Sequence, residues 1–248
     1  MRESLSKYYK NYTDNNGYSM SSVGITSRVA NLVMFIKQHT PKGGKILDVG
    51  CGDMSLANLL PDYEWTGMDI NTKQPNPRRV EHNIESTPYP FEPASFDTIV
   101  CSEVLEHMFN PLEISKEIRR LIKPEGTYVM STPNFHYLDN YLTFFNNIEF
   151  NLTKPWTAEH IRYYSFESHE QMLNAAGFEI DHYTGADAQF SKFFCQGRDV
   201  LRSYLEGFGL KDPDYTKTDQ IIGAMYPLHN HTIMFVSKPV PLDVANEK

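Results

Sequence analysis

The sequence predicts a doubly wound α/β fold, in which seven strands form a mostly parallel sheet with helices on both faces. Short apolar runs alternate with segments of helical periodicity along most of the 248 residues, and glycine or proline often lies at the junctions. Such alternation is typical of parallel sheets with helical crossovers. There is no internal repeat or linker-like stretch, so we expect a single domain over residues 1–248.

The expected strands are short and apolar, and they cover residues 45–49, 63–70, 79–84, 96–102, 127–131, 178–183 and 232–237. One expected helix carries Val29, Leu32 and Ile36 and precedes the first strand. Another begins at Asn110 and Pro111, which suit a cap and a first helical position, and ends at Pro124 and Gly126. A late helix is expected over 165–176, and a short one follows the first strand.

Three segments have no simple place in the sheet. We expect residues 1–40 to form N-terminal cap helices, and residues 133–160 and 185–228 to be insertions over the active site, with a helical stretch near 200–205. Aromatic residues that could line an acceptor pocket crowd the two insertions: Phe135, Tyr137, Tyr141, Phe144, Phe145, Trp156, Phe190, Phe193 and Phe194.

Composition excludes several classes of protein. No apolar run approaches the roughly 20 residues of a membrane span, so no membrane partner is expected. Cys51, Cys101 and Cys195 lack metal-type or paired spacing, which favours a reducing, cytoplasmic location. The net charge of −8 makes nucleic acid an unfavoured partner. The sequence does not indicate an oligomeric state.

A glycine-containing turn follows the first strand, in the run Asp48-Val49-Gly50-Cys51-Gly52-Asp53. Parallel sheets bind ligands at the carboxyl ends of their strands, and glycine lets the backbone approach a ligand closely. A dinucleotide fingerprint needs a third glycine where this chain has Ser55. Asp48 would repel a diphosphate but can accept hydrogen bonds from an ammonium group.

This arrangement resembles motif I of class I S-adenosylmethionine-dependent methyltransferases, with Met54 in place of a common third glycine. Asp69 matches the acid that binds ribose hydroxyls, and the string Ser102 to His107 resembles the motif of the ubiquinone-type branch. The resemblance implies S-adenosylmethionine as cofactor and an antiparallel last strand. It also implies a set of cofactor-binding positions: Arg28, Asp48, Gly50, Cys51, Gly52, Asp69, Ile70, Asn83, Ile84 and Ser102.

Candidate catalytic groups follow the fourth strand, where the transferred methyl group lies in this fold. Glu103 and Glu106 are three residues apart with His107 beside them, and His160 lies in the run His160 to Ser165. That run resembles a segment of glycan- and quinone-modifying methyltransferases. In one interpretation His107 is a general base, oriented by Glu106 or Glu103 with His160 nearby, and Arg162 and Tyr163 orient the acceptor.

A second interpretation makes Glu103, Glu106, His107 and His160 ligands of magnesium or manganese, which lowers the pKa of a coordinated hydroxyl. Small-RNA 3′-terminal 2′-O-methyltransferases have a similar acid–histidine string that holds such an ion. A third interpretation gives Glu106 and His107 a structural role only. The remaining histidines, among them His169 and His182, are expected to pack or to lie at the surface.

We therefore expect an enzyme that methylates an oxygen of a small molecule, sugar or glycan. A metal-dependent terminal-nucleotide RNA 2′-O-methyltransferase is the alternative, and it requires a basic groove that the composition does not indicate. A non-catalytic module that binds S-adenosylmethionine is the second alternative.

Overall fold

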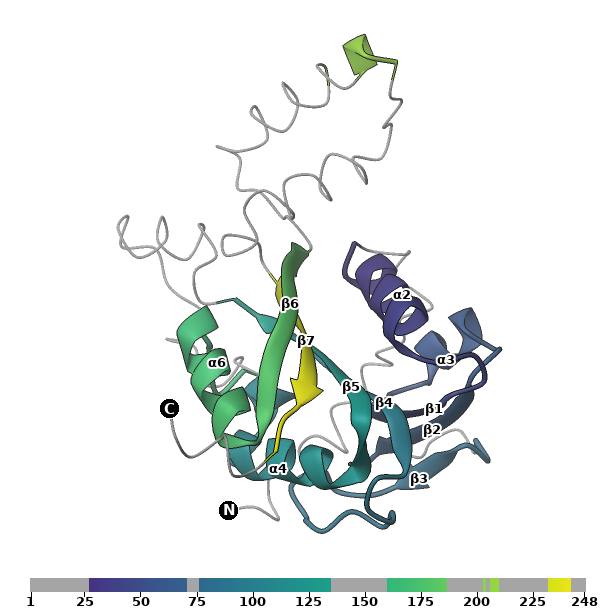
Figure 1. Ribbon diagram of the computed structural model, residues 1–248, viewed down its shortest axis with the longest axis vertical. Helices are drawn as coiled ribbons and strands as arrows, with labels where there is room; N and C mark the ends of the chain where they lie inside the picture. Colours follow the sequence, from purple (N-terminus) through teal and green to yellow (C-terminus); the bar gives the residue numbers. More distant parts are fainter. Residues whose placement is uncertain are drawn as a thin grey trace.

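A computed structural model of the chain describes residues 27–70, 76–134, 160–186, 203, 206–209 and 232–241. Within these ranges seven strands form one sheet in the order β3-β2-β1-β4-β5-β7-β6 (Figure 1). The strands are β1 (Lys45–Val49), β2 (Glu64–Asp69), β3 (Arg79–Glu81), β4 (Phe96–Ser102), β5 (Ile122–Pro133), β6 (Phe178–Ala186) and β7 (Thr232–Pro239). The helices are α2 (Ser27–His39), α3 (Ser55–Leu59), η2 (Leu105–His107), α4 (Pro111–Leu121) and α6 (Phe166–Ala175).

Strand direction places the loops that matter for function at one edge of the sheet. β3, β2, β1, β4 and β5 pair in parallel, whereas β7 is antiparallel to both of its neighbours, β5 and β6. The carboxyl ends of β1, β2 and β4 therefore lie side by side, as ligand binding in an open α/β sheet requires. The predicted mostly parallel sheet and antiparallel last strand are confirmed.

Two apolar layers cover the sheet because successive strand residues face opposite sides. Ile46 of β1 packs with α2 and α3 in one cluster, whereas Leu47 of the same strand packs with α4 and α6 in the other. The same alternation holds in β4, where Val100 faces α2 and Ile99 faces α4. Both layers contain fully buried side chains, so the strand ends are held on a rigid support.

The predicted end of α4 was wrong. The helix stops at Leu121, and the chain passes directly into β5, so that Pro124 and Gly126 lie within the strand. Ile122 already has extended backbone and pairs with Phe96, so sheet pairing overrides the helical pattern there. Asn110 also makes no side-chain cap, and Pro111 alone marks the start of the helix.

The late helix begins with a capping box that the sequence analysis had not identified. The Ser165 hydroxyl accepts a hydrogen bond from the Ser168 N–H at 3.2 Å, and the Ser168 hydroxyl accepts one from the Ser165 N–H at 3.0 Å. Gly177 has a φ of 85°, which turns the chain from α6 into β6. This reciprocal cap fixes the position at which the segment from His160 enters the helix.

Several of the sequence predictions concern residues outside the described ranges. The nine aromatic residues of the two insertions and residues 1–26 lie outside the described residues, as does Cys195. β5 extends through Pro133 and β6 through Ala186, so both insertions begin later than expected. Cys51 and Cys101 are free and buried. None of the helices in the described ranges is long and apolar enough to cross a membrane.

Candidate functional site

The turn after β1 has a backbone shape that only glycine adopts readily. Gly50 has a φ of 76°, and a Cβ atom there would lie 2.4 Å from Cγ2 of Val104, in the loop after β4. Gly52 has a φ of 51° and open space around it. Met54, in the place of the third glycine of the motif, also has a left-handed φ of 60°, and its side chain is buried. At this position the packing of the buried Met54 side chain, rather than the backbone freedom of a glycine, therefore holds the left-handed turn.

Two acids at the ends of β1 and β2 define the charge of this turn. Asp48 is 7% exposed. Burial, together with the negative charges of Asp69 and Asp53, raises its pKa to about 7. Asp69 accepts a hydrogen bond at Oδ2 from the Gly52 N–H at 2.9 Å, so it lies beside the turn. A buried carboxyl among acids fits a ligand that brings a cation, such as the ammonium group of S-adenosylmethionine.

The loop after β3 carries the residues expected at the adenine edge. Asn83 accepts a hydrogen bond at Oδ1 from the Glu85 N–H at 3.0 Å, which closes a tight turn. Ile84, between them, is 8% exposed and belongs to the core layer beneath. The Asn83 side chain thus shapes this loop through its oxygen.

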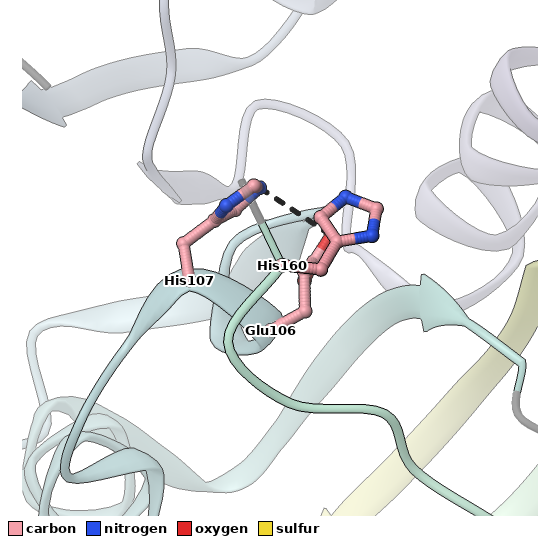
Figure 2. A group of neighbouring side chains, drawn as sticks. All are labelled: Glu106, His107 and His160. Atoms are coloured by element: carbon pink, nitrogen blue, oxygen red, sulfur yellow. Dashed lines mark ion pairs between the residues drawn. The ribbon is translucent and has the colours of Figure 1, made fainter. Parts of the chain in front are cut away.

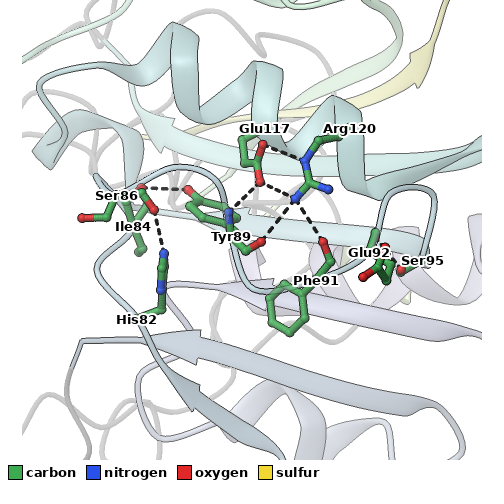
Figure 3. Close-up of polar contacts among 9 residues, drawn as sticks. All are labelled: His82, Ile84, Ser86, Tyr89, Phe91, Glu92, Ser95, Glu117 and Arg120. Atoms are coloured by element: carbon green, nitrogen blue, oxygen red, sulfur yellow. Dashed lines mark hydrogen bonds and ion pairs between the residues drawn. The ribbon is translucent and has the colours of Figure 1, made fainter.

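This loop is anchored to α4 through Tyr89 (Figure 3). The Tyr89 hydroxyl donates to the Ile84 carbonyl oxygen at 2.9 Å, and the Tyr89 N–H donates to Oε1 of Glu117 at 2.7 Å. Arg120 pairs with Glu117 at 2.6 Å and donates to the Tyr89 carbonyl oxygen at 3.3 Å. A half-buried ion pair on a helix therefore holds the loop that carries Ile84.

At the end of β4 a chain of hydroxyl contacts links three of the predicted site residues. Arg28 of α2 donates from Nη1 to the Ser102 hydroxyl at 3.1 Å, and Ser102 and Ser131 share a hydrogen bond of 2.8 Å. The Ser131 hydroxyl also donates to Oε1 of Glu103 at 2.8 Å. Glu103 has a left-handed φ of 55° and is held against β5.

Glu106, His107 and His160 come together, as Figure 2 shows. One ligating atom from each lies within 4.8 Å of the others. Nε2 of His107 is 3.7 Å from Oε1 of Glu106, which is too long for a hydrogen bond, and the two imidazole rings are 4.9 Å apart. Glu103, the fourth predicted metal ligand, is not part of this group.

Glu106 is fully buried, and neither carboxyl oxygen has a hydrogen-bond partner in the described part of the chain. Burial raises the pKa of its carboxyl well above the ordinary value, and the charge of Glu103 raises it further. An unpartnered buried carboxyl is costly, so retaining one is typical of a functional group. Two imidazoles and this carboxyl fit either proton transfer or a divalent cation.

The backbone of the segment that carries His160 is docked on η2. The N–H groups of Ile161 and Arg162 both donate to the carbonyl oxygen of Glu106, at 3.0 and 3.2 Å. The Tyr164 hydroxyl donates to the Leu105 carbonyl oxygen at 3.3 Å. Arg162, which we had expected to orient the acceptor, donates instead to backbone carbonyl oxygens of the loop after η2, those of Met108 and Phe109.

His169 has the packing role expected for it. It is buried, its Nε2 lies 2.6 Å from the Thr132 hydroxyl oxygen, and its ring stacks on Tyr164 at 4.3 Å. Burial lowers its pKa to about 3, so it is neutral at physiological pH. His182 of β6 packs at the edge of Phe35 of α2, 5.5 Å away.

Sequence reasoning missed two residues that shape the site. Ser131 connects Ser102 with Glu103, and its position at the end of the expected fifth strand was a signal that could have found it. Arg79 of β3 donates from Nη1 to the Gly52 carbonyl oxygen at 2.8 Å, and no local pattern marks it. The structure places every predicted cofactor position at or near the carboxyl edge of β1, β2 and β4, with Arg28 reaching in from α2 and Asn83 and Ile84 in the loop beyond β3.

Comparison with known proteins gives a family. A family model described as a methyltransferase domain matches residues 24–183. A ubiquinone biosynthesis O-methyltransferase of Paracidovorax citrulli is 34% identical over 108 residues, which are 38% of this chain and 45% of that protein. A probable S-adenosylmethionine-dependent methyltransferase of Mycolicibacterium smegmatis is 26% identical over 159 residues, 59% of this chain and 56% of that one. The chain thus spans about half the length of these curated relatives.

Solved structures share the fold at low sequence identity. A methyltransferase of Archaeoglobus fulgidus superposes with a TM-score of 0.56 at 17% identity, covering 93% of this chain and 99% of that one. A [4+2]-cyclase, SpnF, superposes with a TM-score of 0.53 at 21% identity, covering 85% and 81%. Since a cyclase has the same fold, the likeness to these structures shows architecture and not chemistry.

Proposed function

This chain belongs to the methyltransferase domain family, and we propose that it transfers a methyl group to an oxygen of a small molecule. S-adenosylmethionine is the cofactor of that family. It supplies a sulfonium methyl group to a nucleophile aligned behind it. The relatives named as ubiquinone biosynthesis O-methyltransferases support an oxygen nucleophile, although the match covers about half of their length. A phenol or a sugar hydroxyl is the acceptor class that we infer.

Residues at the strand ends are ordered in a way that suits this cofactor. We assign Asn83 and Ile84 to the adenine, Asp69 to the ribose hydroxyls, and Asp48 with Gly50 to the methionine part, which follows their order along the strand ends. One carboxylate can accept hydrogen bonds from both hydroxyls of a ribose. The next strand of the sheet, β4, leads to Glu106 and His107, which puts acid–base groups beside the methionine end.

The observation that carries the proposal is the cluster of Glu106, His107 and His160, in which the carboxyl is buried and both imidazoles are partly exposed. A hydroxyl must lose its proton as the methyl group is transferred, and an imidazole is the side chain that most often accepts such a proton. His107 is partly exposed, with 18% of its side chain accessible, whereas Glu106 beneath it is closed to water. We assign His107 as the base, Glu106 as the buried carboxyl beside it, and His160 as the neighbour that faces the acceptor.

An acceptor screen tests this proposal. S-adenosylmethionine with a radiolabelled methyl group is offered together with phenols, sugars and RNA oligonucleotides, and transferred label is counted. We expect transfer to a phenol or sugar hydroxyl, and His107→Gln abolishes most of it while S-adenosylhomocysteine still binds. Transfer only to RNA, or to none of the three classes, contradicts the assignment.

One observation favours a second version of this chemistry. The three ligating atoms lie within 4.8 Å of one another, and magnesium at about 2.1 Å from each ligand holds such atoms roughly 3.0 to 4.2 Å apart. Glu106, His107 and His160 would then hold the ion, which lowers the pKa of the acceptor hydroxyl. Activity in the presence of EDTA separates the versions, because chelation leaves a metal-free base unaffected. We expect no loss, since Glu103, the fourth ligand of that motif, is bonded to Ser131.

A further inference from the structure

The peptide group between Met108 and Phe109 lies between two charged side chains from distant parts of the chain. Its N–H donates to Oε1 of Glu85, and its carbonyl oxygen accepts from Nε of Arg162 at 3.1 Å. Nη2 of Arg162 also donates to the Phe109 carbonyl oxygen at 2.6 Å. Hydrogen bonds to ionised groups are the stronger class, and here an anion and a cation act on opposite ends of one peptide dipole.

The three segments that meet at this peptide are those assigned to cofactor, base and acceptor. Glu85 directly follows Ile84 of the adenine loop, Phe109 lies two residues after His107, and Arg162 lies two residues after His160. The turn at Asn83 fixes the backbone of Glu85. A displacement of the Met108–Phe109 peptide therefore moves His107 relative to the segment of Glu85 and to the segment of His160.

The second carboxyl oxygen of Glu85 indicates that stability is not the main role of this side chain. Oε2 is buried and has no hydrogen-bond partner within the described ranges. An amide side chain would bond the same N–H through its oxygen without burying a charge, so stability alone does not explain a carboxylate at this position. A charged acceptor does, however, hold the peptide more firmly than a neutral one.

We propose that Glu85 and Arg162 are positioning residues that hold the Met108–Phe109 peptide and thereby set His107 against His160. The proposal rests on the function proposed above, because it places both residues relative to the assigned base. Neither side chain belongs to the cluster of Glu106, His107 and His160. Their effect is on geometry, and a displacement of about 1 Å at a catalytic group costs up to roughly 100-fold in rate.

Two residues elsewhere make the same kinds of contact and serve as matched controls. Arg119 donates from Nε and Nη2 to the carbonyl oxygens of Gly177 and Val240, at 3.1 and 2.9 Å. Asp97 accepts a backbone N–H, that of Lys45, at 2.8 Å. Both lie at the amino-terminal edge of the parallel strands, away from the site, so their loss affects stability without affecting the position of His107.

The experiment follows the histidine side chains by NMR in full-length protein saturated with S-adenosylhomocysteine. Histidine carries ¹³C in the ring, and His107→Gln and His160→Gln assign the two resonances. At fixed pH we expect Glu85→Gln and Arg162→Lys each to shift both resonances, because glutamine loses the charge and lysine loses the two-pronged geometry. The double variant shifts them no more than the larger single change, since both act on one peptide.

Thermal unfolding of every variant separates positioning from stability. We expect Arg119→Lys and Asp97→Asn to lower the melting temperature as much as the two positioning variants do, with both histidine resonances unmoved. Wild-type resonances in Glu85→Gln and Arg162→Lys, or equal shifts in the controls, overturn the proposal. No methyl acceptor enters the measurement, so a failed acceptor screen counts against the proposed function and leaves this result independent.

Discussion

The loops after β1 and β4 begin alike and differ in what surrounds their acids. Each strand is followed by a residue with left-handed backbone, Gly50 after β1 and Glu103 after β4. A buried acid lies close to each turn, Asp48 near the end of β1 and Glu106 in η2. Asp48 is surrounded by other acids, whereas Glu106 has two imidazoles beside it. The first arrangement requires a cation from the ligand, and the second can exchange a proton within the protein.

The neighbours of each acid therefore separate binding from chemistry along one edge of the sheet. Changes in the β1 loop should act on cofactor affinity, and changes in the β4 loop should act on rate. Each of the following experiments can break or sharpen that division.

The largest expected effect is on rate. His107→Ala removes the proposed base, and we expect turnover with the identified acceptor to fall by about 10² to 10⁴. Binding of S-adenosylhomocysteine, measured by calorimetry, should remain within about twofold of wild type, because His107 belongs to the β4 loop. Full activity in this variant would falsify both the base and the metal versions of the site.

The second effect concerns pH. The folded chain keeps the Asp48 proton up to a pKa of about 7, against an ordinary value of 3.8. Its stabilising contribution is thus complete below pH 3.8 and is lost as pH rises through 7, by at most about 4 kcal/mol. In the absence of cofactor, the melting temperature of Asp48→Asn minus that of wild type should therefore increase from pH 5 to pH 8.

Asp97 provides the control for that measurement. Although burial acts to raise its pKa, hydrogen bonds from Lys123 and from the Lys45 backbone hold it below the ordinary value. Asp97 is therefore ionised throughout this range, and the offset between Asp97→Asn and wild type should not change from pH 5 to pH 8. A melting temperature of Asp48→Asn that tracks wild type over the whole range contradicts the idea that the β1 loop lacks a cation.

The third effect is on affinity. Asp69→Ala should weaken binding of S-adenosylhomocysteine by about 1.5 to 3 kcal/mol, because charged acceptors to the ribose hydroxyls and to the Gly52 N–H are lost together. Calorimetry measures the change, and Asp181→Ala, at an exposed position on β6, is the matched control. Unchanged affinity in Asp69→Ala places the ribose elsewhere.

The smallest expected effect is the difference in unfolding free energy between two glycine variants, which separates backbone strain from a steric clash. Gly43 and Gly50 both have positive φ, but a Cβ atom meets nothing within 4 Å at Gly43 and lies 2.4 Å from Val104 at Gly50. Gly43→Ala should cost about 1 kcal/mol of unfolding free energy and Gly50→Ala about 2 to 3 kcal/mol. Val104→Ala should recover most of the difference in denaturant titrations, and a failure to do so means that the two loops do not press on each other.

Sequence reasoning predicted the β1 side of the molecule better than the β4 side. The bounds of β1 and β4 were predicted to the residue because continuous apolar runs mark buried strands, and the glycine turn is visible in neighbouring letters. Glu103 was grouped with the metal ligands from its spacing to Glu106 and from the resemblance to the acid–histidine string of small-RNA methyltransferases. Its left-handed backbone and its bond to Ser131, 28 residues later, depend on strand pairing, which no local pattern contains. The end of α4 was missed for the same reason.

The position of β7 has a consequence for how the chain is made. It is the last of the seven strands along the chain, yet it lies inside the sheet, between β5 and β6. Domains are synthesised from the amino terminus. A nascent chain that has emerged only through β6 therefore contains the loops after β1, β3 and β4, but β5 has an unpaired edge. A chain stalled on the ribosome before residue 232 therefore lacks β7, and the unpaired edge of β5 can accept another strand. The sheet is complete only once β7 has been inserted between β5 and β6.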